Sequence, residues 1–111
     1  MDKYIFDFLK SLCIPPNLQG YSYIISAIKI CLECSVMPGM GELYEAVAVA
    51  HSTSSKRVER SIRHAIEHGF KLAPEEAICQ FMSPHSYQLR PANSAFIGAA
   101  VEWLRMEEAQ K

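Results

Sequence analysis

The chain has 111 residues, about the size of one domain, with room for a single modest core but not for a catalytic and a regulatory domain together. Half of the residues are apolar and 21% are charged, which excludes a disordered or fibrous chain and indicates one domain over residues 1–111. No apolar stretch approaches the roughly 20 residues of a membrane span, and the N-terminal residues lack a secretory signal. We therefore expect a cytoplasmic protein.

Apolar residues recur at helical spacing along most of the chain, and strand alternation is almost absent. This pattern predicts an all-α fold of about six helices in a compact bundle. The first helix is expected over Asp2–Cys13, with Asp2 as its N-cap, and the prolines of "IPPN" end it. A second helix is expected over Leu18–Val36. Its predicted inner stripe is Tyr21, Ile24, Ile25, Ile28, Leu32 and Ser35.

The segment "MPGMG" at residues 37–41 combines proline and glycine and predicts a turn. A short helix is expected after it, over Glu42–His51. The inner face of this helix should consist of Leu43, Val47 and Ala50.

A fourth helix, about 54–69, follows the polar stretch "HSTS", with Thr53 or Ser54 as its N-cap. Its apolar residues fall in one arc of about 100°; they are Val58, Ile62, Ala65, Ile66 and Gly69. The opposite arc holds Lys56, Arg57, Arg60, Arg63, His64, Glu67 and His68. Five Lys and Arg residues against two Glu residues give positions 51–71 a charge of +3 in a chain of net charge −1. Such a distribution steers an anionic partner to one face.

Two further helices are expected in the C-terminal part of the chain. The segment "LAPEEAICQFM" predicts a short helix from about Pro74, with two glutamates near the positive end of the helix dipole. After a loop, Asn93 is the expected N-cap of a last helix over Ser94–Glu108. Its predicted inner stripe is Phe96, Ile97, Ala100, Val101 and Leu104.

Residues 42–69 join a short helix, a polar turn and a basic helix, which is the pattern of a helix-turn-helix. In that motif the N-terminal residues of the second helix contact base edges, and Arg can donate two hydrogen bonds to guanine. The basic residues at that end are Lys56, Arg57 and Arg60. Arg63 and His64, one turn further on, are better placed for phosphates. The alternative interpretation is a solvated basic face, with Glu59 pairing to Arg63 at i,i+4 spacing.

The segment "SKRVERSIRHAIE" resembles the recognition helix of the C-terminal effector domain of the stage-zero sporulation master regulator of endospore-forming bacteria. The segments at 14–28 ("IPPNLQGYSYIISAI") and 90–108 ("RPANSAFIGAAVEWLRMEE") resemble the family's entry into its second helix and its last helix. The resemblance implies a six-helix response-regulator effector domain. It also implies a sequence-specific transcriptional regulator that binds double-stranded DNA, is not an enzyme and requires no cofactor or metal.

The resemblance also assigns roles to individual residues. It implies base reading by Arg57, Glu59 and Arg60, and a carboxylate such as that of Glu59 can accept a hydrogen bond from cytosine. Lys56 occupies a position that usually holds a small polar residue in the family. We include Lys56 because it lies at the same end of the helix as Arg57 and Arg60. The expected base-reading set is Lys56, Arg57, Glu59 and Arg60. The expected backbone-contacting set is Ser54, Ser55, Arg63, His64 and Arg90.

Two features depart from the family pattern. Val49 and Ala50 stand just before the turn, where the family usually carries lysines, which predicts fewer phosphate contacts and a shallower salt dependence. The family protein also has an N-terminal phosphoryl-receiver domain, whereas this chain starts at the effector domain. The expectation is that the domain acts unregulated or under another control.

Two motifs raise the possibility of metal chemistry. The segment "HAIEH", His64–His68, matches the H-x-x-E-H zinc motif, with Glu107, Glu108 or His85 as the only candidates for a third ligand. The segment "CLEC", Cys31–Cys34, is a C-x-x-C pair expected inside the second helix, without a second pair. We favour a chance match for the first motif and buried packing thiols for the second.

The main alternative function is that of an interaction protein. A receiver-less domain can modulate transcription by pairing with a full-length relative or with RNA polymerase. Trp103 and Met106 flank the inner stripe of the last helix, so they belong either to a protein interface or to the edge of the core. Homodimerisation through the last helix is the corresponding structural hypothesis.

Overall fold

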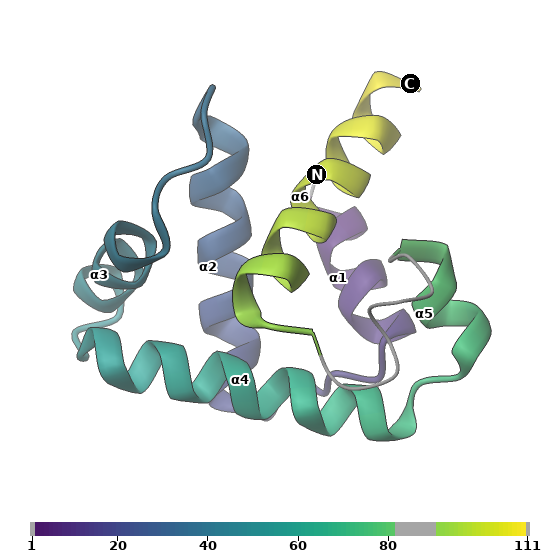
Figure 1. The fold of residues 1–111 in the computed structure, drawn as a ribbon, viewed down its shortest axis with the longest axis horizontal. Coiled ribbons are helices and arrows are strands. Elements are labelled where there is room, and N and C mark those ends of the chain that lie inside the picture. Colours follow the sequence, from purple (N-terminus) through teal and green to yellow (C-terminus); the bar gives the residue numbers. More distant parts are fainter. Residues whose placement is uncertain (1, 82–90, 111) are drawn as a thin grey trace.

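A computed structural model describes residues 2–81 and 91–110. Within these residues the chain forms six helices and no strand, which confirms the predicted all-α class. The helices are α1 (Asp2–Ser11), α2 (Gln19–Glu33), α3 (Met40–Ala50), α4 (Ser55–Leu72), α5 (Glu75–Phe81) and α6 (Asn93–Ala109). The long helix α4 runs along one edge of the molecule, and α2 and α6 extend away from it (Figure 1). No helix in the described part of the chain is long and apolar enough to cross a membrane.

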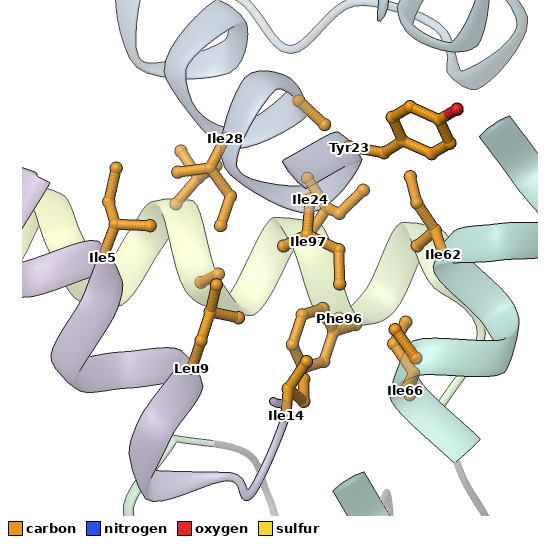
Figure 2. Close-up of a cluster of buried hydrophobic side chains, with 14 of the residues drawn as sticks. Ile5, Leu9, Ile14, Tyr23, Ile24, Ile28, Ile62, Ile66, Phe96 and Ile97 are labelled. Carbon is orange, nitrogen blue, oxygen red and sulfur yellow. The ribbon is translucent and has the colours of Figure 1, made fainter. Parts of the chain in front are cut away.

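One hydrophobic core joins α1, α2, α4 and α6. Figure 2 shows its aliphatic side chains pointing toward one another from these helices; they include Ile5, Leu9, Ile24, Ile28, Ile62, Ile66 and Ile97. Phe8 lies among them, with its ring centroid 5.6 Å from that of Phe96 and 5.8 Å from that of Trp103. Removal of this apolar surface from water is the main favourable term in folding.

The inner faces of α4 and α6 are those that the sequence predicts. All five residues of the predicted α4 arc are buried: Val58, Ile62, Ala65, Ile66 and Gly69. All five residues of the predicted last-helix stripe are buried as well: Phe96, Ile97, Ala100, Val101 and Leu104. In both helices the side opposite the apolar stripe holds mostly polar or small residues, so periodicity identifies the buried face.

The second helix differs from its prediction in length and in orientation. It ends at Glu33, three residues early, and Cys34 is its C-cap. Its buried residues are Gly20, Tyr23, Ile24, Ala27, Ile28 and Cys31. The predicted residues Tyr21, Ile25 and Leu32 are only half-buried, and Ser35 is exposed beyond the helix. Because α2 is apolar around most of its circumference, its buried face is chosen by the helix that crosses it at Gly20.

The third helix begins at Met40, inside the segment predicted to be a turn. Gly39 is its N-cap in extended backbone, and the Gly39 carbonyl oxygen accepts from the Leu43 N–H at 3.0 Å. Leu43 and Val47 are buried as predicted, but Ala50 is exposed and Ala48 is buried in its place.

Helices α1 and α3 end in the same kind of turn, with a non-glycine residue in the left-handed region. Cys13 has φ 60° and Ser52 has φ 54°. Beyond them, the Ile14 N–H donates to the Leu9 carbonyl at 3.0 Å, and the Thr53 N–H donates to the Ala48 carbonyl at 2.9 Å. These are the hydrogen bonds of a Schellman motif, which satisfies carbonyls at the helix end. The first helix therefore stops at Ser11 rather than Cys13.

Two of the predicted N-caps are wrong. Asp2 is the first residue of α1, not the residue before it. Asn93 is likewise the first residue of α6, and Ala92 is the N-cap, without a side-chain cap bond. Asparagine is a common N-cap because its side chain can accept from the helix N–H groups, but the Asn93 side chain is turned toward α3 and α4 instead.

Helix α4 lies across α2 at a point where the two backbones nearly touch. A methyl group added at Gly20 would overlap the carbonyl oxygen of Ser61 and lie 2.8 Å from the Cβ of Ala65. The other end of α4 packs against the turn after α1. A methyl group at Gly69 would lie 2.5 Å from the Leu12 carbonyl oxygen. Both contacts require a residue without a side chain.

Gly20→Ala is expected to destabilise the protein by about 3 kcal/mol, because the added methyl group meets backbone that cannot move without displacing α4. Gly98→Ala is the matched control: it lies within α6, and a methyl group there would have no neighbour within 4 Å. That change should stabilise the protein by about 0.5 to 1 kcal/mol through helix propensity. Chemical denaturation measures both, and equal effects of the two substitutions would contradict the proposed close contact.

Candidate nucleic-acid interface

The N-terminal end of α4 is held by a side-chain cap. Ser54 has extended backbone, and its Oγ accepts a hydrogen bond from the Arg57 N–H at 3.1 Å. The sequence left Thr53 and Ser54 as alternatives, and the structure identifies Ser54. Helix α4 therefore begins at Ser55, and Lys56 and Arg57 lie in its first turn, beside the positive end of the helix dipole.

The exposed basic residues of this end gather around one hollow of the surface. The hollow has a volume of about 450 Å³ and is lined by Ser54, Lys56, Arg57, Arg60 and Ser61. Lys56, Arg57 and Arg60 are all exposed, and in the described part of the chain none of the three forms an ion pair. These three cations can bind an anion without first breaking a contact within the protein.

Glu59 and Arg63 lie on a different side of α4. Arg63 Nη1 donates to Glu59 Oε2 at 2.8 Å, so the i,i+4 pair considered from the sequence is formed. The two residues line a second hollow, between α3, α4 and the start of α6. The structure thus brings Lys56, Arg57 and Arg60 together but separates Glu59 from them.

The remaining predicted contact residues have different surroundings. Ser55 Oγ donates to Glu45 Oε2 of α3 at 2.5 Å, so its hydroxyl hydrogen is already engaged. His64 is exposed one turn beyond Arg60. Arg90 lies outside the described residues.

Two polar residues of α3 and the turn were not identified from the sequence. Glu45 ties α3 to the first turn of α4 through Ser55. The Nε2 atom of His51 forms a hydrogen bond with Ser26 Oγ at 2.7 Å. The His51 ring also packs edge-on against the Tyr23 ring, with ring centroids 5.0 Å apart. These contacts link residues far apart in the sequence, so no local pattern indicates them.

Val49 and Ala50, the residues before the turn, are on the surface. Val49 is 72% exposed and Ala50 is also exposed, in the last turn of α3. Neither side chain can form an ion pair or a hydrogen bond with a phosphate. Among the described residues around the turn from α3 to α4, the exposed cations Lys56, Arg57 and Arg60 therefore all belong to α4.

The H-x-x-E-H segment lies on α4, where His64 is exposed and His68 is half-buried. The described residues contain no group of three or more His, Cys, Asp or Glu side chains that could hold a metal ion. Glu107 and Glu108 lie in the last turn of α6, and His85 lies outside the described residues.

The C-x-x-C pair is at the end of α2 rather than inside it. Cys31 is buried in the last turn, whereas Cys34 is the C-cap, which corrects the prediction. Burial raises the pKa of the Cys31 thiol, the neighbouring Cys34 raises it further, and the Arg105 guanidinium opposes both. Arg105 Nη2 also donates to the carbonyl oxygens of Cys31 and Cys34, at 3.0 and 2.8 Å. Cys31 packs in the core, and the raised pKa disfavours the thiolate form that a nucleophile would need.

A comparison with protein families matches residues 5–104 to the family described as "Sporulation initiation factor Spo0A C terminal". The match begins in α1, includes α3, the turn and α4, and ends within α6. It therefore covers the basic end of α4 and the helices that hold it in position.

Ser54→Ala is expected to lower the free energy of unfolding by about 1 kcal/mol, because the cap of α4 is lost. Thr53→Ala is the matched control, since Ser54 and not Thr53 accepts from Arg57. Denaturant unfolding should show a clearly smaller effect for Thr53→Ala. A larger effect of Thr53→Ala than of Ser54→Ala would contradict the assignment of the cap.

Proposed function

The chain belongs to the family of the C-terminal domain of sporulation initiation factor Spo0A, and from this membership we propose that it is a sequence-specific DNA-binding transcriptional regulator. The family consists of DNA-binding effector domains of a sporulation regulator and is a transcription-factor family, not an enzyme family. We further propose that residues 1–111 form one helix-turn-helix domain, with α3, the turn and α4 as the motif at about 42–69. Its place of action would be the cytoplasm, where bacterial DNA lies.

The observation that carries this proposal is the cluster of exposed cations at the start of α4, which form no ion pair with the described residues. Lys56, Arg57 and Arg60 are exposed around one hollow, and the Ser54 cap fixes the helix that presents them. In a helix-turn-helix this end of the second helix faces the base edges in the major groove. We therefore assign base reading to these three residues, with Arg57 and Arg60 suited to two hydrogen bonds with guanine.

Glu59 and Arg63 require a rearrangement to contact DNA. Their side chains are 32% and 40% exposed, and an ion pair at such an exposure stabilises by only about 0.2 to 1 kcal/mol. A DNA phosphate can therefore replace Glu59 as the ion-pair partner of Arg63. The Glu59 carboxylate can then accept a hydrogen bond from cytosine. Phosphate contacts are also proposed for Ser54, Ser55, His64 and Arg90, where Ser55 would use its backbone N–H.

A second candidate function is a protein interaction through the last helix. Met106 is 56% exposed and Met37 is 39% exposed, and both line one groove along α6. Exposed methionines suit an apolar partner surface. Trp103, by contrast, packs against Phe8 at the edge of the core. Homodimerisation, or pairing with a full-length relative or RNA polymerase, would use this groove.

The proposed function is tested by DNA binding of the purified protein. One duplex carries the recognition box of the family, and the other carries the same bases in scrambled order; each is titrated over a range of salt concentrations. We expect a preference for the box of about 10³ or more, and an affinity for both duplexes that falls as salt rises. Binding that is equal on both duplexes, or undetectable on both, would contradict the proposal and favour the protein-interaction alternative.

Substitutions in α4 separate base reading from phosphate contact. Arg60→Ala should weaken binding to the box by about 1 to 3 kcal/mol and relax sequence preference, whereas Arg63→Ala should weaken binding to both duplexes alike. Lys10→Ala, on the exposed surface of α1, is the control with the same change in net charge and should leave binding nearly unchanged. Equal losses of preference in the Arg60 and Arg63 variants would show that their roles are wrongly assigned.

A further inference from the structure

Asn93 is the one buried polar side chain among the residues that the structure describes. It is 7% exposed and is the first residue of α6, at the point where α6 meets α3 and α4. A buried amide is costly unless its donors and acceptor find partners, so its contacts indicate what it does.

The amide of Asn93 contacts two other helices through one atom. Its Nδ2 donates to Tyr44 Oη of α3 at 3.1 Å and to the main-chain carbonyl oxygen of Glu59 in α4 at 3.0 Å. A carbonyl oxygen can only accept, so the nitrogen of the amide must face Glu59. The Oδ1 atom then has no hydrogen-bond partner in the described part of the protein.

An arrangement with one orphaned oxygen is not the most stable way to fill this position. An unsatisfied buried polar atom is unfavourable, and an apolar side chain of similar volume would avoid it. The hydrogen bonds of Asn93 are therefore better explained by the geometry that they impose than by the stability that they add.

The atom that Asn93 contacts in α4 lies between the proposed base-reading residues. Glu59 follows Arg57 by two positions and precedes Arg60. Because its carbonyl is part of the helix backbone, it cannot shift without moving the Cα atoms of both arginines. Base contacts depend steeply on distance and angle, whereas the attraction between a cation and a phosphate falls slowly with distance. A small displacement of α4 would thus weaken base reading far more than phosphate contact.

We propose that Asn93 is a positioning residue for sequence readout, which holds the backbone of α4 against α3 at the level of Arg57 and Arg60. The proposal rests on the proposed DNA-binding function and adds to it a residue of α6, outside the helix-turn-helix. Asn93 need not touch DNA for this role; it acts through the carbonyl of Glu59 and the hydroxyl of Tyr44.

The test measures the affinity of Asn93→Ala for the box duplex and for the scrambled duplex, at a temperature where thermal unfolding shows the variant to be folded. The preference for the box should fall about tenfold, while the affinity for the scrambled duplex and its salt dependence stay as in the unmodified protein. Ser94→Ala is the matched control, because Ser94 is the next residue of α6 and is exposed. It should keep the full preference.

Two further variants cover the case in which Asn93→Ala does not fold. Asn93→Asp keeps the shape of the side chain and suits the positive end of α6, but it cannot donate to Glu59. It should show the same loss of preference. Tyr44→Phe removes only one of the two acceptors and should lower the preference by a smaller factor.

The outcomes separate this proposal from the proposed function. If the unmodified protein does not distinguish the two duplexes, the proposed function itself is wrong. If it does distinguish them and the folded Asn93 variants keep the full preference, the positioning role is overturned. Equal losses of affinity on both duplexes, in step with lowered thermal stability, would also overturn it, because they would show a purely structural role.

Discussion

Gly20 of α2 lies directly against the backbone of α4. A larger residue at this position would collide with the Ser61 carbonyl oxygen and the Ala65 side chain. The orientation of α4 about its own axis follows from this contact. Once Ala65 and its apolar neighbours face α2, Lys56, Arg57 and Arg60 must face solvent. Gly69 anchors the other end of the helix on the turn after α1. The basic surface is thus a consequence of how closely two helix backbones approach each other.

Around this crossing, polar contacts cap α4 and join neighbouring helices. Ser54 caps α4, and Ser55 is tied to Glu45 of α3. Asn93 joins α6 to α3 and to the second turn of α4. At the opposite end of α2, Arg105 binds the last carbonyl groups. A hydrogen bond of this kind stabilises a protein by about 0.5 to 1.5 kcal/mol. Together these contacts hold α4, whose first two turns expose Lys56, Arg57 and Arg60, in a chain of net charge −1.

The sequence predicts the fold class and the faces of α4 and α6 because the side opposite each apolar stripe holds mostly polar or small residues. It predicts the face of α2 only in part. Ile24 and Ile28 are buried as expected, but α2 is apolar around most of its circumference, and its orientation depends on the contact at Gly20. The sequence assigns Asn93 wrongly as an N-cap, because asparagine forms both local cap hydrogen bonds and long-range hydrogen bonds such as those to Tyr44 and Glu59. The cluster of Lys56, Arg57 and Arg60 follows from helical spacing. The same spacing sets Glu59 at the edge of the inner face, apart from that cluster. Its place beside α3 and α6 depends on contacts between helices that no local pattern indicates.

We propose that the outer face of α4 reads DNA because of the way α2, α3 and α6 hold the helix. The structure of the protein bound to a duplex carrying the family's recognition box is the decisive test. We expect α4 to lie in the major groove, with Arg57 and Arg60 within hydrogen-bond distance of base edges and the Asn93 contact to Glu59 intact. A complex in which DNA contacts another face, or in which α4 touches only phosphates, would contradict it.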